Sequence, residues 1–279
     1  MNNLSSLTLK EKRKLSFVQT ILKPISRKRG PYIEFEIQKG NFLIKTATTK
    51  EELMQAYELR YEVFHNEFGG KKNTLGLDYD RYDKQADLLV TIDLKTQKVI
   101  GTYRVICSAF SKKFYSSSEF SIQNFLDEKD VKVELSRACI HKDYRNGSAI
   151  RLLWRGVYYY LNQVKARYLF GCSSISELSS HRILSIMQYL HKNKLTIHKW
   201  GIVPHHIYDR SRELLRELGD IDSQNSIELF PALFRAYLNA GAKFEIVPAY
   251  DANFSCYDFF TVLDVRDLKA THIRTLGAC

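Results

Sequence analysis

Charged side chains occur where the sequence predicts apolar strands, helices and the loop between them. Six ionisable residues share this property: Arg60, Asp80, Asp83, Arg104, Glu134 and Arg137. A charge within an apolar strand is costly unless an opposite charge pairs with it. Two interpretations stay open. The residues form ion pairs that only support the fold, or they line a polar pocket in which acids hold and deprotonate an amine and arginines hold a carboxylate or orient the acids.

Strand alternation decides which of these side chains can meet. Arg104 falls on the same face of its predicted strand as Thr102, because neighbouring residues of a strand point to opposite faces. Glu134 and Arg137 are three residues apart, so a regular strand would place them on opposite faces. A β-bulge between them would change that placement.

A second pattern is a strand that runs into a glycine-bearing turn and then into a helix. The strand ends near Ile140, the turn contains Arg145-Asn146-Gly147, and the helix begins near Ala149. The unpaired N–H groups of a helix start carry partial positive charge and suit a phosphate, and Arg145 adds a formal charge. An ordinary strand–turn–helix connection remains the alternative. The turn has neither GK[ST] nor GxGxxG, so it is not a Walker or dinucleotide-binding loop.

Hydrophobic patterning indicates the elements that would position these residues. We expect strands at 41–49, 87–93, 98–107, 131–140, 168–175, 244–247 and 258–265, and helices at 51–68, 122–126, 149–165, 177–193 and 229–240. Residues 194–226 show no clear pattern. Antiparallel strand runs with helices between them predict an α+β fold with a mixed sheet. One domain with a C-terminal elaboration is the most economical organisation.

The overall composition excludes several classes of protein. The chain has 279 residues, of which 44% are hydrophobic and 26% charged, as in globular proteins. It has no apolar run of ~18 residues, so we expect no membrane-spanning helix. The five cysteines form no CxxC pair and predict neither a disulfide scaffold nor a zinc site. We therefore expect a reduced, cytoplasmic protein without a metal.

The net charge of +11 is unevenly distributed. Residues 1–30 contribute +7, and residues 31–279 contribute only +4. Within the first segment, Leu15, Val18 and Leu22 recur at helical spacing among the basic residues. The segment is interpreted as a basic amphipathic arm ahead of a domain spanning 31–279. Such an arm can contact an anionic membrane or a nucleic acid, or it can be a solvated tail.

Four charged motifs in chain order resemble those of the acyl-homoserine-lactone synthases. They are Leu59–Phe64, Asp80–Asp83, Gly101–Arg104 and Glu134–Arg137. The segments His141–Gly147 and Leu153–Gly156 are more similar to the ornithine-lipid and other N-acyl amino acid synthases of the GNAT-type acyltransferases. The resemblance covers residues 42–190 and, more weakly, Leu229–Val265, where Asp251 and Asp258 resemble the family's closing segment. It implies a GNAT-like sheet, mixed and mostly antiparallel, flanked by helices.

The resemblance also implies a reaction. An acyl or 3-hydroxyacyl chain arrives as a thioester on acyl carrier protein, with coenzyme A as the less favoured donor. No cofactor is permanently bound. The phosphopantetheine would pass Ala138 and Cys139. Its phosphate would lie at Arg145, Asn146, Gly147, Ser148 and Ala149. The acceptor would be the α-amine of an amino acid, with ornithine the leading candidate and a lyso-ornithine-type lipid the product.

Roles for the charged residues follow from the same resemblance. Glu134 would be the base, acting through a water, and Arg137 and Arg104 would organise the pocket. The acceptor side, or a lid over it, would contain Arg60, Phe64, Asp80 and Asp83. A carboxylate beside an apolar tunnel can have its pKa raised toward neutrality, which suits this task. Direct attack needs no covalent intermediate, so Cys139 and Cys172 are interpreted as core residues.

Two alternatives remain. A signal synthase that releases an acyl lactone shares the same fold, although Phe68-Gly69-Gly70 stands where the lactone synthases have a tryptophan. The phosphate loop is also shorter than the usual Q/RxxGxG/A. A nucleic-acid-binding protein would use the basic arm, but the remaining chain carries only +4 and no nucleic acid is expected. We expect residues 1–30 to contact the anionic inner face of the cytoplasmic membrane.

Overall fold

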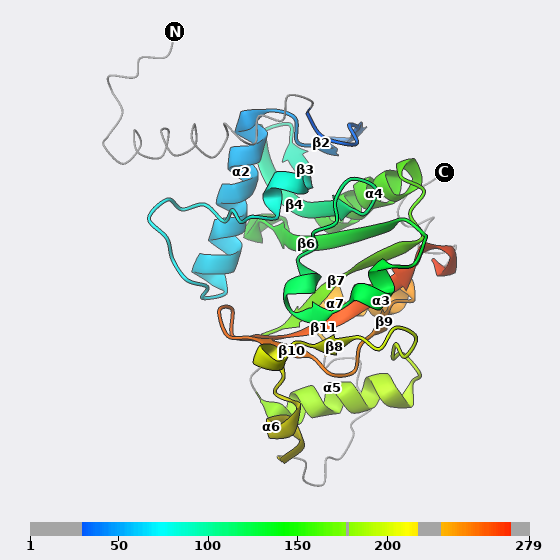
Figure 1. Ribbon diagram of the computed structural model, residues 1–279. Helices are drawn as coiled ribbons and strands as arrows, with labels where there is room; N and C mark the ends of the chain where they lie inside the picture. Colours follow the sequence, from blue (N-terminus) through cyan, green and yellow to red (C-terminus); the bar gives the residue numbers. More distant parts are fainter. Residues whose placement is uncertain (1–29, 177–178, 217–229, 269–279) are drawn as a thin grey trace.

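A computed structural model describes residues 30–176, 179–216 and 230–268 (Figure 1). Residues 1–29, which make up all but the last residue of the predicted basic arm, lie outside the described residues. Among the described helices, none combines the length and the apolar character needed to cross a lipid bilayer.

The centre of the described structure is a nine-stranded sheet with the order β1-β2-β3-β4-β6-β7-β11-β10, in which β9 pairs with β11. Its strands are β1 (Glu36–Lys39), β2 (Phe42–Thr46), β3 (Asp87–Asp93), β4 (Lys98–Cys107), β6 (Lys132–Ile140), β7 (Tyr168–Ile175), β9 (Lys243–Phe244), β10 (Ala249–Asp251) and β11 (Cys256–Asp264). Every neighbouring pair is antiparallel except β6 and β7, which are parallel. A separate two-stranded sheet joins β5 (Phe120–Ser121) and β8 (Val203–Pro204).

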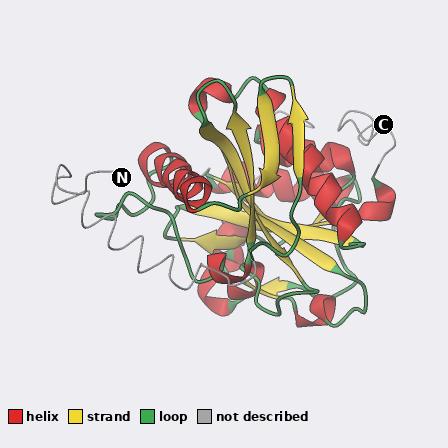
Figure 2. Ribbon diagram, turned by 90° about the horizontal axis from the view of Figure 1, so that it is seen from above, coloured by secondary structure: helices red, strands yellow, loops and turns green. Residues whose placement is uncertain are grey.

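Helices cover both faces of the sheet, as Figure 2 shows from above. The α-helices are α2 (Lys50–Tyr61), α3 (Gln123–Leu126), α4 (Ser148–Gln163), α5 (Ser180–Lys192), α6 (Ser211–Arg216) and α7 (Ala232–Ala240). On β3, Leu88 packs in the same cluster as Tyr57 of α2, whereas Leu89 packs in the same cluster as Leu153 of α4. Because Leu88 and Leu89 are neighbours in a strand, α2 and α4 lie on opposite faces.

The start and end of α2 have clear local causes. Thr49 caps the helix by accepting the Glu52 N–H at 3.1 Å, and the Glu52 carboxylate accepts the Thr49 N–H at 3.0 Å. After Tyr61 the chain widens into a π-helix, Glu62–Glu67, in which Phe68 N donates to Val63 O at 3.1 Å. Such wide turns are frequent at functional sites. The single helix expected at 51–68 is therefore two different helical segments.

Strands β6 and β7 diverge after a short paired stretch. Their register runs only from Lys132–Glu134 to Tyr168–Phe170, and beyond it the two strands separate (Figure 1). On its other side, β6 stays paired with β4 from Val133 to Ile140. A parallel pair that opens in this way leaves room for a ligand between two strands of one sheet.

A β-bulge interrupts β6 at Arg137. Arg104 of β4 faces Ser136, and Thr102 faces Cys139, so two residues of β6 oppose one residue of β4. Arg137 has φ = 53°, a backbone conformation that costs free energy for a residue other than glycine. The bulge turns the Arg137 side chain toward the acids that Arg104 contacts, which regular alternation from Glu134 would not do.

The predicted fold class is confirmed: the sheet is mixed, mostly antiparallel and flanked by helices. The strands expected at 87–93, 98–107 and 168–175 have these bounds in the structure. Besides α2, several regions differ from the prediction. The strand expected at 244–247 is only β9, Lys243–Phe244, and β10 was not expected. Residues 36–39 form β1, which pairs with β2, and the unassigned segment 194–226 contains β8 and α6 in its described part.

Candidate active site

Arg60 is fully buried between two aspartates. Its Nε donates to Asp78 Oδ1 at 2.8 Å, and its Nη1 donates to Asp83 Oδ1 at 2.6 Å. Asp83 has no exposed side-chain surface either. Burial alone would lower the pKa of Arg60, but the charges of Asp78 and Asp83 raise it well above its ordinary value. The guanidinium therefore remains charged and ties α2 to the loop ahead of β3.

Two further arginines meet at Asp80. Arg104 Nη1 donates to Asp80 Oδ1 at 2.7 Å, and Arg137 Nη2 donates to Asp80 Oδ2 at 3.4 Å. Arg104 also donates from Nε to Ser136 Oγ at 2.9 Å, while its Nη2 is buried without a hydrogen-bond partner. Burial opposes ionisation of Asp80, but the charge and hydrogen bond of Arg104, together with the charges of Arg137 and Arg60, lower its pKa.

Asp78 links this network but escaped the sequence analysis. Besides Arg60, it accepts from Arg137 Nε at 3.3 Å and contacts His65 Nε2 at 3.0 Å. Burial would raise the pKa of Asp78, yet the Arg60 charge lowers it well below its usual range. The hydrogen bond to Asp78 raises the pKa of His65. An acid two residues before Asp80 in the same loop was the available signal.

The structure brings together five of the predicted site residues in one network. They are Arg60, Asp80, Asp83, Arg104 and Arg137. Phe64, the remaining acceptor-side candidate, lies beside it: its ring centroid is 5.7 Å from Arg137 Cζ. Phe254, from the loop after β10, covers the same guanidinium at 5.3 Å.

Glu134 lies on β6, three residues before Arg137, and is also fully buried. Its Oε2 accepts from Tyr115 N at 2.8 Å, and its Oε1 accepts from both Ser116 N and Ser116 Oγ at 2.7 Å. Burial raises the pKa of this carboxyl, while the three donors favour its charged form. Its described contacts are with segment 115–116 rather than with Arg137.

The predicted phosphate loop has the expected geometry of a strand, a turn and a helix start. Gly147 adopts φ = 88° immediately before α4, which begins at Ser148. The Asn146 side chain accepts the Ser148 N–H at 3.0 Å, and Ala149 is buried at the first turn. Arg145 instead points to the π-helix, where it pairs with Glu67 at 2.7 Å. The role of this loop as a phosphate site stays a prediction.

Ala138 and Cys139, the residues predicted along the pantetheine path, follow the bulge on β6. Cys139 is buried in the same cluster as Tyr57 and Leu88. Burial raises the pKa of the Cys139 thiol to about 12, and burial also raises that of Cys172 well above its ordinary value. Both side chains are therefore neutral thiols near pH 7, and a thiolate is the form that attacks carbonyl groups.

A cavity lies where β6 and β7 diverge. It is small and is lined by β6, β7, β11 and α7, including Leu135, Leu169, Tyr237 and Leu263. A Cβ atom at Gly171 would overlap the carbonyl oxygen of Leu135, so only glycine allows the two strands this approach. The lining is mostly apolar, as suits a hydrocarbon chain.

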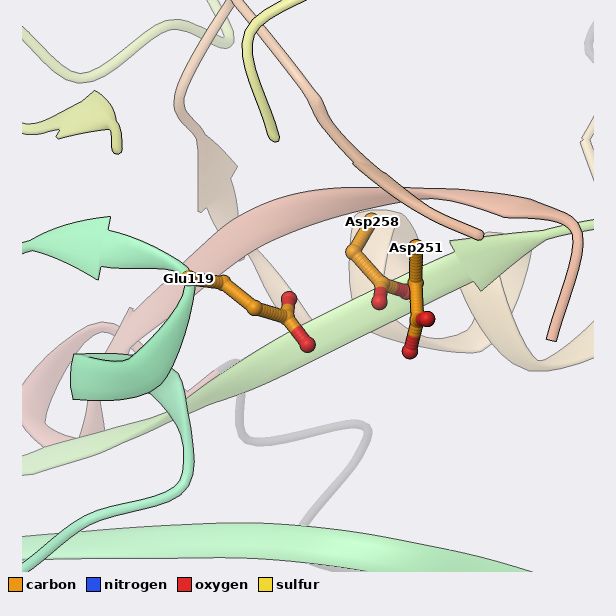
Figure 3. Close-up of side chains that lie close together, drawn as sticks. All are labelled: Glu119, Asp251 and Asp258. Atoms are coloured by element: carbon orange, nitrogen blue, oxygen red, sulfur yellow. The ribbon is translucent and has the colours of Figure 1, made fainter. Parts of the chain in front are cut away.

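Three acids, Glu119, Asp251 and Asp258, form a cluster beside β10 and β11 (Figure 3). Carboxylate oxygens of Glu119, Asp251 and Asp258 all lie within 4.8 Å of one another, in an arrangement that could hold a cation. Burial, and next the charge of Asp258, raise the pKa of Glu119 to about 9. Burial is also the main cause that raises the pKa of Asp258 to about 6. Sequence reasoning gave none of these acids a role.

Comparison with known proteins indicates the class of enzyme. Residues 59–155 match the family model described as an acetyltransferase (GNAT) domain. An L-ornithine N(alpha)-acyltransferase of Brucella abortus is 27% identical over 255 residues, which cover 86% of this chain and 90% of that protein. The enzyme of the same name from Agrobacterium fabrum is 25% identical over 252 residues, covering 85% and 86%. The expected acyltransferase class is confirmed.

Solved structures also match over most of the chain. TofI, in a ternary complex with an inhibitor and MTA, has a TM-score of 0.47 at 11% identity and covers 85% of this chain and 96% of its own. The CoA-dependent acyl-homoserine lactone synthase BjaI has a TM-score of 0.46 at 13% identity, covering 82% of each chain. FeeM, an N-acyl amino acid synthase, has a TM-score of 0.43 at 9% identity, covering 84% and 93%.

Proposed function

We propose that the protein transfers an acyl chain from a thioester to the α-amine of ornithine. The observation that carries this proposal is the match to L-ornithine N(alpha)-acyltransferases over 83–86% of the chain. The match extends well beyond the GNAT domain model at 59–155.

The donor is an acyl group on a phosphopantetheine arm, carried by acyl carrier protein or by coenzyme A. The apolar cavity at the divergence of β6 and β7 supports the acyl part of this proposal. The start of α4 supports the phosphate part, because N–H groups at a helix N-terminus attract anions. Arg145 would exchange Glu67 for the phosphate when the donor binds.

The reaction converts a thioester and an amine into an amide and a thiol. The α-amine first loses a proton, because an ammonium has no lone pair with which to attack. A C–N bond then forms at the thioester carbonyl, the C–S bond breaks, and the departing sulfur receives a proton. Glu134 is the candidate base, because its buried carboxyl has a raised pKa and Ser116 Oγ, 2.7 Å away, could relay the proton.

Arginine side chains of the network supply the acceptor contacts in this proposal. Arg104 Nη2 is buried without a partner, and it is a donor that the α-carboxylate of an amino acid could satisfy. Arg137 is held by Asp78 and Asp80 at longer distances of 3.3 and 3.4 Å, so it is the less firmly occupied guanidinium. Arg60, enclosed by Asp78 and Asp83, supports the two aspartates from behind.

The test is acylation by the purified full-length protein. Ornithine is offered with 3-hydroxyacyl and simple acyl chains on acyl carrier protein and on coenzyme A, and products are identified by mass spectrometry. We expect an N-acyl ornithine with a clear preference for one carrier. No transfer from either carrier, or release of an acyl lactone, would overturn the proposal.

Glu134→Gln tests the assignment of the base. Loss of a general base reduces kcat by about 100- to 10,000-fold, and we expect a fall in this range with the KM for ornithine changed much less. The side chain is nearly isosteric, so the unfolding temperature is measured alongside. Unchanged kcat in a folded variant would exclude Glu134 as the base.

Residues 1–30 are proposed to contact an anionic membrane surface, on the strength of their +7 charge and apolar spacing. Flotation with anionic liposomes compares the full chain with a form that begins at Pro31. Binding should be lost while transfer to ornithine continues, as expected if 31–279 is the catalytic domain. Equal binding by both forms would remove this role.

A further inference from the structure

The acids Glu119, Asp251 and Asp258 form a buried cluster that the proposed reaction does not use. Glu119 follows a 3-10 helix (Ser116–Ser118), whereas Asp251 ends β10 and Asp258 lies on β11. Glu119, Asp251 and Asp258 are only 2%, 5% and 3% exposed, respectively. Three separate segments of the chain therefore converge to place carboxylates within 4.8 Å of one another.

No cation balances this cluster within the part of the chain that the structure describes. None of the ion pairs there includes Glu119, Asp251 or Asp258. Glu119 Oε2 is buried and has no hydrogen-bond partner, and Figure 3 shows this carboxylate directed toward the two aspartates. Buried carboxylates without a counter-charge are costly, so the cluster must hold protons when it is empty.

Tyr115 connects this cluster to the arginines. The Cζ atoms of Arg104 and Arg137 lie 5.7 and 5.2 Å from its ring centroid. A hydrogen bond with the Tyr115 side chain lowers the pKa of Glu119, but burial and the charge of Asp258 raise it by more. Tyr115 therefore contacts both Arg104 and Glu119. Arg104 Nη2 is a donor without a partner, and Glu119 Oε2 is an acceptor without one.

These two unsatisfied atoms match a ligand with opposite charges at its ends. An amino acid with a basic side chain carries an α-carboxylate for the arginines and a terminal ammonium for the acids. A divalent metal would satisfy the acids alone and leave Arg104 Nη2 unpaired. The chemistry thus favours an alkylammonium group over a metal ion.

We propose that Glu119, Asp251 and Asp258 bind the side-chain ammonium of the acceptor amino acid. This proposal rests on the proposed acyl transfer to ornithine and names the part of the site that selects a dibasic acceptor. It also directs the reaction. An ammonium surrounded by carboxylates keeps its proton and cannot attack the thioester, which leaves the α-amine as the nucleophile.

The experiment is a competition between ornithine and norvaline, which is ornithine without the terminal amine. Both are present in one reaction with the full-length protein, and the product ratio gives the ratio of kcat/KM. A site built around a polar group rejects the analogue that lacks it strongly, so we expect wild-type protein to favour ornithine by at least ~100-fold. Glu119→Gln, Asp251→Asn and Asp258→Asn should each reduce this ratio at least ~10-fold.

Glu245→Gln is the matched control. Glu245 is a buried acid whose pKa is raised to about 7 by burial. None of the three clustered acids contributes to this shift. Its variant should keep the wild-type ratio. A thermal-shift measurement with ornithine and with norvaline provides a second readout that needs no catalysis: ornithine should stabilise the wild type more, and the cluster variants should lose this difference.

The outcomes separate the two proposals. Cluster variants that fold and keep the wild-type ratio would overturn the ammonium site while leaving ornithine acylation intact. Loss of the ornithine preference after dialysis against EDTA, with recovery on addition of Mg²⁺ or Ca²⁺, would show a metal site and also overturn it. Wild-type protein that acylates neither amino acid would overturn the proposed function itself.

Discussion

Two buried groups of charges, joined by Tyr115, differ in how they are balanced. In the first, Arg60, Arg104 and Arg137 pair with Asp78, Asp80 and Asp83. In the second, the acids Glu119, Asp251 and Asp258 face one another without a described cation. The first group is balanced in charge and forms a framework, in which Arg104 Nη2 is a donor left without a partner. The second is incomplete and reads as a place for a positively charged ligand.

The pKa shifts follow this division. Burial opposes ionisation of Asp78, but Arg60, His65 and Arg137 together lower its pKa well below the ordinary value. Burial, with Asp258 as the next cause, instead raises the pKa of Glu119 to about 9. Equal burial thus gives opposite shifts, because only one of the two acids has an arginine beside it.

The largest effect on stability should come from opening the framework. Arg60→Met leaves Asp78 and Asp83 buried without their main partner, which costs about 3–5 kcal/mol when a buried pair is broken. Chemical denaturation measures the loss. Arg81→Met, at an exposed arginine of the same loop, should cost less than about 1 kcal/mol. Equal losses in the two variants would contradict the framework interpretation.

An effect of similar size should appear in the pH dependence of Glu119→Gln. Because the folded protein raises the pKa of Glu119 from 4.5 to about 9, it binds more protons than the unfolded chain between these values. The contribution of this group is fully present below pH 4.5 and is lost as the pH rises toward 9. One extra bound proton corresponds to about 1.4 kcal/mol per pH unit.

The measurement is the free energy of unfolding of both proteins from pH 5 to pH 8.5. The wild type should lose stability relative to Glu119→Gln as the pH rises. Asp78 acts in the opposite direction: its stabilisation is present above pH 3.8 and is lost only on acidification. Parallel curves for wild type and Glu119→Gln would mean that folding does not raise the pKa of Glu119, and would contradict a cluster without a counter-charge.

The smallest effect on stability should come from Arg145→Gln. Its pair with Glu67 is exposed, and exposed pairs contribute about 0–1 kcal/mol. If the start of α4 binds the donor phosphate, the variant should instead raise the KM for the thioester with little change in kcat. A donor KM equal to that of the wild type would remove Arg145 from the phosphate site.

Sequence patterns predicted most of the framework because its parts are local. The strands at 87–93, 98–107 and 168–175 are runs rich in β-branched and aromatic residues, and strand alternation raised the question of a bulge between Glu134 and Arg137. The bulge itself depends on how β4 and β6 pair, which no local pattern contains. Asp78 was overlooked because a polar loop does not show which of its acids is buried.

The acid cluster was harder to predict for a different reason. Asp251 and Asp258 were noticed only as part of a resemblance, and Glu119 ends a serine-rich turn that looks like an ordinary loop. The three acids meet because β10 pairs with β11, while segment 115–119 is held by Glu134 through Tyr115 and Ser116. These contacts are long-range, and spacing along the chain carries no sign of them.

The most direct test of the account is the structure of the product formed from ornithine and an acyl thioester. Fragmentation by tandem mass spectrometry distinguishes an acyl group on the α-nitrogen from one on the side-chain nitrogen. We predict acylation at the α-nitrogen alone, because the acid cluster keeps the side-chain amine protonated. Acylation at the side-chain nitrogen, or no amide product at all, would contradict the account.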